Sequence, residues 1–437
     1  MRIRIASDRI LIFSFFISVI LAGSLLLALP GIYREGRLDY IDALFTATSA
    51  VCVTGLITVD TANFGIFGQT IIMILIQTGG LGIITFATVF LAAPRRRISI
   101  VGRGVVGEYA LSEVEYQPKV IIRSIVKYTF IFEAAGFVIY CIAFGVRGRS
   151  LFDALFHAVS AFCNAGFSTF SNNLENYLRN PLVNLATIAL VVTGGLGFLV
   201  IKDIRKHLGG QRTHLSYHSA VVLRTTSFLL VVGTVVFFIL ESSSSMADLS
   251  LPEKLMASLF QAVTPRTAGF DTIAQGSLSQ GSQLLTMLLM FIGASPASTG
   301  GGIKTTTFYL LVITAFRYRD SSDQVSHGKR KIPPRLIFKA VGVVVKAIII
   351  ILAAAILVII AEAGSGISLA DTLFEIVSAF GTVGLSKGIT ASLGSFSKFV
   401  LIVTMFTGRV GLFALALPRG RRDVDGYADL PSAEVLL

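Results

Sequence analysis

Four segments of the chain resemble one another closely enough to be copies of one unit. Each copy has a polar start, an amphipathic stretch with a Leu-Phe pair, and a glycine followed by an aromatic residue or leucine. The copies are DYIDALFTATSAVCVTGL from Asp39, SLFDALFHAVSAFCNAGF from Ser150, PEKLMASLFQAVTPRTAGF from Pro252 and SLADTLFEIVSAFGTVGL from Ser368. Their glycines, separated by 111, 103 and 115 residues, are Gly55, Gly166, Gly269 and Gly384. Such repetition predicts a fold built from repeated structural units.

Long apolar runs flank every copy. The preceding runs cover roughly residues 10–29, 121–144, 220–240 and 338–360, and the following runs roughly 67–93, 183–201, 284–316 and 399–417. Hydrophobic residues make up 54% of the chain and charged residues 14%, which excludes a soluble domain. The first run is too long for a signal peptide, so we expect it to be retained. Two spans in each of four copies predict eight membrane helices.

The repeated segment itself is too short to cross a membrane. About 10–12 helical residues followed by a glycine-containing stretch fit a re-entrant half-helix and loop lining a water-filled cavity. We therefore expect an all-α integral membrane protein with four helix–pore loop–helix repeats around a pseudo-fourfold pore. The expected units are repeat 1 at 1–97, repeat 2 at 98–207, repeat 3 at 208–330, repeat 4 at 331–420 and a tail at 421–437.

The charge pattern orients these spans. The net charge of +12 comes from basic clusters between the spans, as in 95–103, 202–212 and 317–335. The positive-inside rule explains them without nucleic-acid binding, and it places both termini and the loops between repeats in the cytoplasm. The opposite side is richer in acids, which would attract cations: Asp39, Asp42, Asp60, Asp153, Glu175, Asp248, Asp271 and Asp371. Four arginines on the same side dilute this charge, so we expect only a modest attraction: Arg34, Arg37, Arg147 and Arg149.

The glycine loops are candidates for an ion selectivity filter. Four loops around one axis could aim backbone carbonyl oxygens at a monovalent cation and replace its hydration shell. The candidate residues are Cys52, Val53, Thr54, Gly55, Cys163, Asn164, Ala165, Gly166, Thr267, Ala268, Gly269, Gly381, Thr382, Val383 and Gly384. No ring of Asp or Glu occurs at these positions, which argues against a carboxylate-lined filter. Capping or close-packing glycines are the alternative, but four in register favour pore loops.

The second span of each copy carries a further glycine motif. The motifs begin at Thr78, Thr193, Thr299 and Thr407, and paired glycines in mid-span loosen or break a helix. The third copy is the most irregular, reading GASPASTGGGIK from Gly293 to Lys304. We expect this stretch to line the cavity below the filter. In the fourth copy Arg409 is an ionisable residue at membrane depth, and therefore a functional candidate, although it could also pair with a carboxylate.

These motifs together resemble the Trk/Ktr/HKT superfamily of potassium transporters, closest to the membrane subunit of Ktr systems. The most specific segments are IDALFTATSAVCVTGL, LFHAVSAFCNAGFS, FQAVTPRTAGFDT and VSAFGTVGLSKGIT. The resemblance implies a channel-like subunit for potassium uptake in a prokaryotic cytoplasmic membrane, and Gly55 points to potassium over sodium. It also implies that residues 293–305 act as an intramembrane gate with Arg409 as a barrier to cations. The gate candidates are Gly293, Ser295, Ser298, Thr299, Gly300, Gly301, Gly302, Lys304 and Arg409.

The same resemblance implies partners. Ktr membrane subunits form homodimers on a cytoplasmic RCK-type ring, so a regulatory nucleotide, ATP or ADP, is expected on that partner and no cofactor beyond K⁺ on this chain. A role for Na⁺ is possible. The basic loops 94–123, 202–218 and 317–339 could dock the ring, and the tail 419–437 could contact the ring or a second copy.

Other functions fit the sequence less well. A sodium-coupled or sodium-conducting secondary cation transporter is the alternative, but such transporters usually have two inverted halves, whereas these four copies share one orientation. The GxGxxG match at 102–107 follows no strand, and Ile303 interrupts the P-loop-like stretch before Lys304. No catalytic arrangement recurs near a filter, so we do not expect an enzyme. We expect Arg266 to point behind the filter; its role and that of Lys304 stay open.

Overall fold

The computed structural model describes residues 2–34, 36–92, 118–146, 148–211, 213–317, 325–327 and 330–411. Within these ranges the chain is helical except for one antiparallel hairpin, β1 (Val325–His327) with β2 (Arg330–Ile332). In this hairpin Val325 pairs with Ile332 and His327 with Arg330. The expectation of a helical chain is therefore correct apart from the hairpin, which lies between repeats 3 and 4.

Each repeat contains a long helix, a short helix and a second helical segment. The long helices are α1 (Arg2–Leu27), α5 (Pro118–Phe144), α9 (Tyr217–Glu241) and α13 (Pro334–Ala361). The short helices are α2 (Tyr40–Val51), α6 (Arg149–Cys163), α10 (Leu251–Val263) and α14 (Leu369–Gly381). The second segments begin with α3 (Ile66–Ala92), α7 (Pro181–Leu196), α11 (Gln280–Phe291) and α15 (Ser395–Phe406). A single 3₁₀ turn precedes each of them: Thr61–Asn63, Glu175–Tyr177, Gln275–Ser277 and Thr390–Ser392.

Local sequence explains where several of these helices begin. The side chain of Asn180 accepts the first free N–H groups of α7, and Pro181 occupies the first helical position. Ser250 and Glu253 form a capping box at the start of α10, and Ser368 caps α14. These caps fix the start of the short helices in repeats 3 and 4, and thereby the positions of the loops that follow them.

The glycine motifs act differently in the four copies. The helix α3 runs without interruption through Gly79 and Gly80, whereas α7 ends at Gly197, whose φ is 88°, and α8 (Phe198–Leu208) leaves at an angle of 100°. In repeat 3, residues 292–304 are not helical and separate α11 from α12 (Thr305–Arg317). In repeat 4 the segment Thr407–Gly411 is a π-helix. The second helix is thus disturbed at the motif in repeats 2, 3 and 4 but not in repeat 1, and in repeat 4 this happens without paired glycines, because Arg409 follows Gly408.

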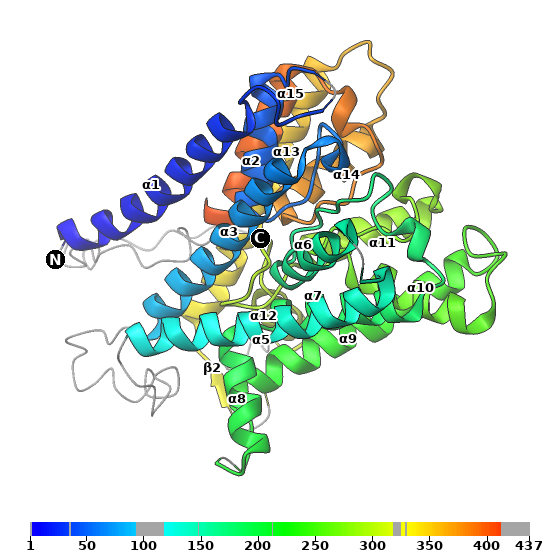
Figure 1. Cartoon of the computed structure of the whole chain (residues 1–437). Helices are drawn as coiled ribbons and strands as arrows, with labels where there is room; N and C mark the ends of the chain where they lie inside the picture. Colours follow the sequence, from blue (N-terminus) through cyan, green and yellow to red (C-terminus); the bar gives the residue numbers. More distant parts are fainter. Residues whose placement is uncertain are drawn as a thin grey trace.

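The four repeats pack in a closed ring (Figure 1). The second helix of each repeat contacts the short helix of the next repeat, so that α3 lies on α6, α7 on α10, α11 on α14 and α15 on α2. The last contact joins repeat 4 back to repeat 1. The four short helices therefore lie inside a ring of longer ones, and their C-terminal ends lead into the glycine loops.

Long apolar helices surround this centre. Among the described residues three helices are long and apolar enough to cross a membrane: Ile122–Phe144, Tyr217–Glu241 and Pro334–Ala361. The bent pair α7 and α8 is a fourth candidate, and Ile12–Leu27 and Ile66–Gly82 are apolar but shorter. Eight spans are reached only if these six segments are joined by the second helices of repeats 3 and 4, which are interrupted after α11 and α15.

Candidate functional site

The segments after the short helices share one backbone conformation. In every copy both the filter glycine and the residue two positions before it have positive φ, while the residue between them does not. The pairs, with their φ values, are Val53 (54°) and Gly55 (95°), Asn164 (59°) and Gly166 (70°), Thr267 (70°) and Gly269 (72°), and Thr382 (49°) and Gly384 (95°). An ordinary strand points successive groups to opposite sides. Alternating the sign of φ lets successive carbonyl groups face the same side.

The four segments meet in a closed ring of backbone contacts. Each filter glycine lies against the carbonyl oxygen that precedes the filter glycine of the next repeat. The pairs are Gly55 with Ala165, Gly166 with Ala268, Gly269 with Val383, and Gly384 with Thr54. A Cβ built on Gly55 would lie 2.5 Å from the Ala165 oxygen, so no side chain fits between adjacent repeats. The structure thus brings all fifteen candidate filter residues together, and all are buried.

Side chains at the C-terminal ends of the short helices, or in repeat 3 just after the helix, hold these segments in place. One Ser or Thr lies five or six residues before each filter glycine: Ser49, Ser160, Thr264 and Ser378. Ser49 accepts a hydrogen bond from the Gly55 amide at 3.0 Å, and Ser378 accepts one from the Gly384 amide at 3.1 Å. Ser160 and Thr264 instead donate to the carbonyls of Phe167 and Phe270, at 2.7 and 2.6 Å. Sequence reasoning missed these residues, although a Ser or Thr recurs five or six positions before the glycine in all four copies.

A further polar side chain breaks the symmetry beyond the glycines. The Asn173 amide donates to the carbonyls of Gly166 and Gly269, at 3.3 and 3.4 Å. Asn173 itself has φ 49°, and its buried Oδ1 has no hydrogen-bond partner in the described part of the chain. Two of the four glycine carbonyls are therefore shared with a side chain. Sequence reasoning missed Asn173 because no counterpart marks its position in the other repeats.

The irregular stretch of repeat 3 lies directly against the filter segments. Ile292 and Ile303 pair as an isolated bridge at the base of this loop, and its glycines are buried. A Cβ on Gly300 would collide with the hydroxyl of Thr267, and one on Gly301 with that of Thr382. The Ser295 and Thr299 amides donate to carbonyls at the end of α7, at 3.0 and 3.2 Å. The loop therefore joins repeats 2, 3 and 4 next to the four glycine segments.

Two cationic side chains hold this loop by its carbonyl oxygens. Lys304 Nζ donates to the carbonyl of Gly300 at 2.7 Å and approaches that of Gly301 at 3.4 Å. Arg409 donates to the carbonyl of Thr299 and, at 3.4 Å, to that of Gly79. Arg409 is 3% exposed, and these partners are carbonyls rather than carboxylates. Arg409 thus links the π-helix of repeat 4 to the loop of repeat 3 and to the second helix of repeat 1.

The first glycine of the second-helix motif does not make the same contact in all four repeats. In three copies the first glycine of the second-helix motif, Gly79, Gly194 or Gly408, lies against a carbonyl at the end of the short helix of its own repeat. Gly300 aligns with them in sequence but lies against the Thr267 hydroxyl instead. The longer spacing in repeat 3 moves this glycine out of the helix and into the loop.

Some of the acids expected to attract cations are already paired. The side chain of Asp42 accepts a hydrogen bond from Lys398 at 2.7 Å, Asp371 pairs with Lys387, and Asp153 lies 3.6 Å from Arg149. Of the remaining acids, Asp271 is the one nearest in sequence to a filter glycine, and burial raises its pKa to about 8. The acidic character of this side is weaker than the residue count predicts.

Part of the sequence interpretation falls outside the described residues. The tail 421–437, the GxGxxG match at 102–107, and most of the expected docking segments 94–123 and 419–437 lie there. Two expected repeat boundaries fall inside elements, 207/208 within α8 and 330/331 within β2. Within the described ranges no group of three or more His, Cys, Asp or Glu side chains could hold a metal ion.

Comparison with known proteins places this geometry in context. The family model described as "TrkH: Cation transport protein" matches residues 1–422. The chain is 40% identical over 420 residues to the Ktr system potassium uptake protein B of Bacillus subtilis, covering 94% of this chain and 92% of that one. It is 35% identical over 424 residues to the potassium/sodium uptake protein NtpJ of Enterococcus hirae, covering 95% and 93%.

A solved structure shares the fold. The crystal structure of the potassium transporter TrkH from Vibrio parahaemolyticus aligns with a TM-score of 0.76 at 21% identity, covering 94% of this chain and 83% of that one. The fold of this chain, with its closed ring of repeats, therefore resembles that of a solved structure over nearly its whole length.

Proposed function

The chain belongs to the TrkH family of cation transport proteins, and we propose that it is the potassium-translocating membrane subunit of a Ktr-type uptake system. In this proposal K⁺ crosses the cytoplasmic membrane of a prokaryote through a pore on the axis between the four repeats. The names of the bacterial relatives support potassium as the ion, because similarity to them extends over nearly the whole chain.

The observation that carries the proposal is the ring of glycines and neighbouring carbonyl oxygens. A filter must offer oxygen atoms in place of the hydration shell of the ion. The ring that contains the backbone oxygens of Thr54, Ala165, Ala268 and Val383 would supply them. The short helices end at this ring, so the partly negative ends of their dipoles favour a cation there. In a membrane the non-helical segments would be tolerated because they line the pore.

The loop at residues 292–304 serves as the gate. It lies against the Thr267 and Thr382 hydroxyls, so it occupies the path directly below the filter. Lys304 and Arg409 hold it there and place positive charge in the path of a cation. For K⁺ to pass, the loop must move and both side chains must release its carbonyls. Shortening the loop over residues 294–301 should therefore increase ion flux.

The membrane arrangement follows from the repeats. With two crossings and one re-entrant loop per repeat, eight spans place both termini and the basic loops in the cytoplasm. We further propose a homodimer that sits on a cytoplasmic RCK-type ring carrying ATP or ADP, docked through the basic segments. The name "Ktr system" of the relatives supports an assembly of several subunits.

Complementation tests the proposal. Expressed with its ring partner in bacteria that lack potassium uptake, the protein should restore growth at low potassium. The change Gly55→Ser places a Cβ 2.5 Å from the Ala165 oxygen and should lower the preference for K⁺ over Na⁺. Gly364→Ser is a matched control, because Gly364 has φ 93° but nothing within 4 Å of an added Cβ. Unchanged ion preference after serine substitution at all four filter glycines would refute the filter assignment.

Sodium transport is the second candidate, because one relative is named as a potassium/sodium uptake protein. The purified protein in liposomes distinguishes the two functions. A potassium channel-like subunit should carry Rb⁺ down its gradient without a sodium gradient. A sodium-coupled transporter should require one, and a sodium-conducting one should carry Na⁺ at a comparable rate.

A further inference from the structure

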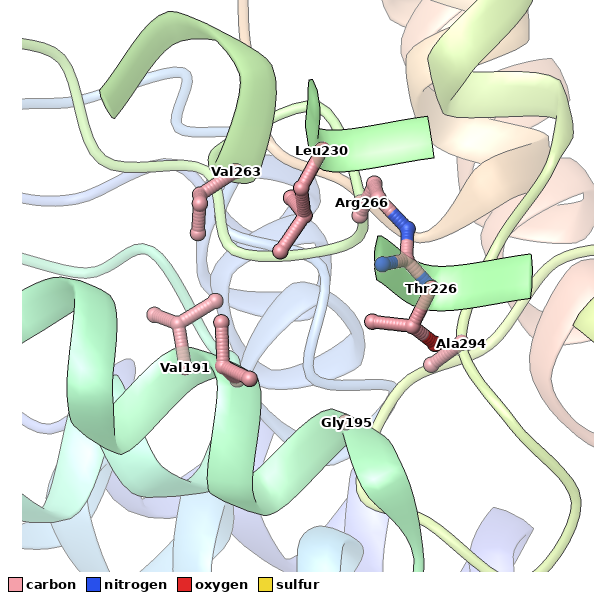
Figure 2. A pocket seen from close by; sticks show the side chains of 8 residues that line it. Val191, Gly195, Thr226, Leu230, Val263, Arg266 and Ala294 are labelled. Carbon is pink, nitrogen blue, oxygen red and sulfur yellow. The ribbon is translucent and has the colours of Figure 1, made fainter. Parts of the chain in front are cut away.

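A small cavity lies behind the filter segment of repeat 3, away from the ring of carbonyls (Figure 2). Its walls come from α7, α9 and α10 and from Ala294 at the start of the gate loop. Valine and leucine side chains supply most of the lining. The volume open to the centre of a water molecule is about 10 Å³, so the cavity has room for about one water molecule.

The guanidinium group of Arg266 enters this apolar cavity without a protein partner. Arg266 is 8% exposed, no described residue forms a hydrogen bond or ion pair with its side chain, and its Nε atom is fully buried. Figure 2 shows the group beside Thr226 of α9, whose buried hydroxyl also has no partner in the described structure. No Asp or Glu side chain is among the residues that line the cavity.

Such an isolated charge is costly, and the protein treats other buried cations differently. Lys304 and Arg409 bond to loop carbonyls, and Lys398 is paired with Asp42. Removing an ion from water without compensation costs several kcal/mol. The C-terminal end of α10 offers partial negative charge of roughly half a unit, which offsets only part of the guanidinium charge. Because no carbonyl in the described part of the chain accepts from the Arg266 side chain either, an anion is the occupant that would best balance the remaining positive charge.

We propose that this cavity binds a small monovalent anion, such as chloride, between Arg266 and Thr226. Arginine has only donors, and a threonine hydroxyl can donate, so both groups suit an acceptor that offers no hydrogen of its own. A water molecule would satisfy the donors but leave the charge unbalanced. A halide ion is only somewhat larger than the single water molecule that this space holds, whereas a phosphate group or a carboxylate ligand is several times larger. The anion lies between the filter segment that begins at Thr267 and the loop at Ala294, so it stabilises the junction of filter and gate.

Thermal unfolding of the purified full-length protein tests the site. Gluconate is replaced by chloride or bromide at constant potassium concentration and ionic strength, because gluconate is too large for the cavity. The unfolding midpoint of the wild type should rise with chloride and reach a plateau. Arg266→Gln should remove this dependence, whereas Arg266→Lys should retain part of it. Arg179→Gln, at a side chain that is 65% exposed, is the matched control and should respond like the wild type.

Bromide anomalous scattering from wild-type crystals gives an independent result if Arg266→Gln does not fold. The expected peak lies within hydrogen-bond distance of the Arg266 guanidinium. The proposal is overturned if the midpoint is the same in chloride and gluconate, if Arg266→Gln responds like the wild type, or if the cavity holds water without bromide. Neither measurement includes transport, so either proposal can fail while the other stands.

Discussion

The first prediction concerns Lys304, whose ammonium group, in the proposed mechanism, holds the loop at residues 292–304 in its closed position. The change Lys304→Met keeps a side chain of similar length but removes the charge and the hydrogen bonds to the loop. One of these bonds, to Gly300, is short at 2.7 Å, and the other, to Gly301, is long at 3.4 Å. We therefore count only the first in full. The Arg409 contacts with Thr299 and Gly79 remain, so the loop loses one of its two cationic anchors.

The size of the effect follows from that one bond. A hydrogen bond to a charged group contributes about 1.5–3 kcal/mol. Losing it from the closed state alone shifts the ratio of open to closed loop by about 10- to 150-fold. Flux through the unassisted protein should rise by up to this factor, and by less if the loop is already open for much of the time.

Rubidium uptake into liposomes that contain the purified membrane subunit alone measures this flux. Lys304→Met should increase the initial rate at equal protein content. Lys346→Met is the matched control, since Lys346 is exposed on α13 and should leave the rate unchanged. Unaltered or reduced flux in a folded Lys304→Met protein would contradict the role of Lys304 as an anchor of the gate.

Three further predictions concern the outer side of the protein. Asn173→Ala removes the hydrogen bonds that the amide donates to the carbonyls of Gly166 and Gly269, each of which contributes about 0.5–1.5 kcal/mol. The half-saturating K⁺ concentration for uptake should therefore change by about two- to tenfold. No change would show that the amide does not compete with the ion for these carbonyls. Burial raises the pKa of Asp271 to about 8, so its carboxyl is neutral at pH 6 and charged at pH 9. Uptake at limiting K⁺ should rise from pH 6 to pH 9, and this rise should be smaller in Asp271→Asn. The same raised pKa affects the free energy of unfolding: the stability that the neutral carboxyl contributes is complete below the pKa of the unfolded chain and is lost as pH rises through 8. Glu241→Ala removes the acceptor of hydrogen bonds from Ser245 and Ser279, so the free energy of unfolding should fall by about 1.5–3 kcal/mol if one such bond is lost. A lower thermal unfolding midpoint measures this loss, and an unchanged midpoint would mean that water replaces the bonds.

Much of the architecture could be predicted because it is written in local patterns. The repeated segments mark the short helices, and their glycines mark the positions where positive φ and close backbone approach leave no room for a side chain. The unusual composition of residues 293–304 marks the one long interruption of a second helix. These features depend on a few neighbouring residues, so one sequence is enough to see them.

Features that depend on distant residues could not be predicted in the same way. The pair of Lys398 with Asp42 joins repeat 4 to repeat 1 across almost the whole chain, and nothing near either residue indicates the other. The same holds for Asn173, which reaches the Gly269 carbonyl of the next repeat. On the acid-rich side, the dilution by Arg149 could be expected from its place beside Asp153, whereas the pairing of Asp42 with Lys398 could not.

The central claim is that K⁺ passes between the four glycines. Crystals of the protein grown with rubidium or thallium in place of potassium test it directly through anomalous scattering. The account predicts a peak on the axis bounded by Gly55, Gly166, Gly269 and Gly384, and a weaker or absent one when sodium competes. A strong site elsewhere with no peak on this axis would contradict it.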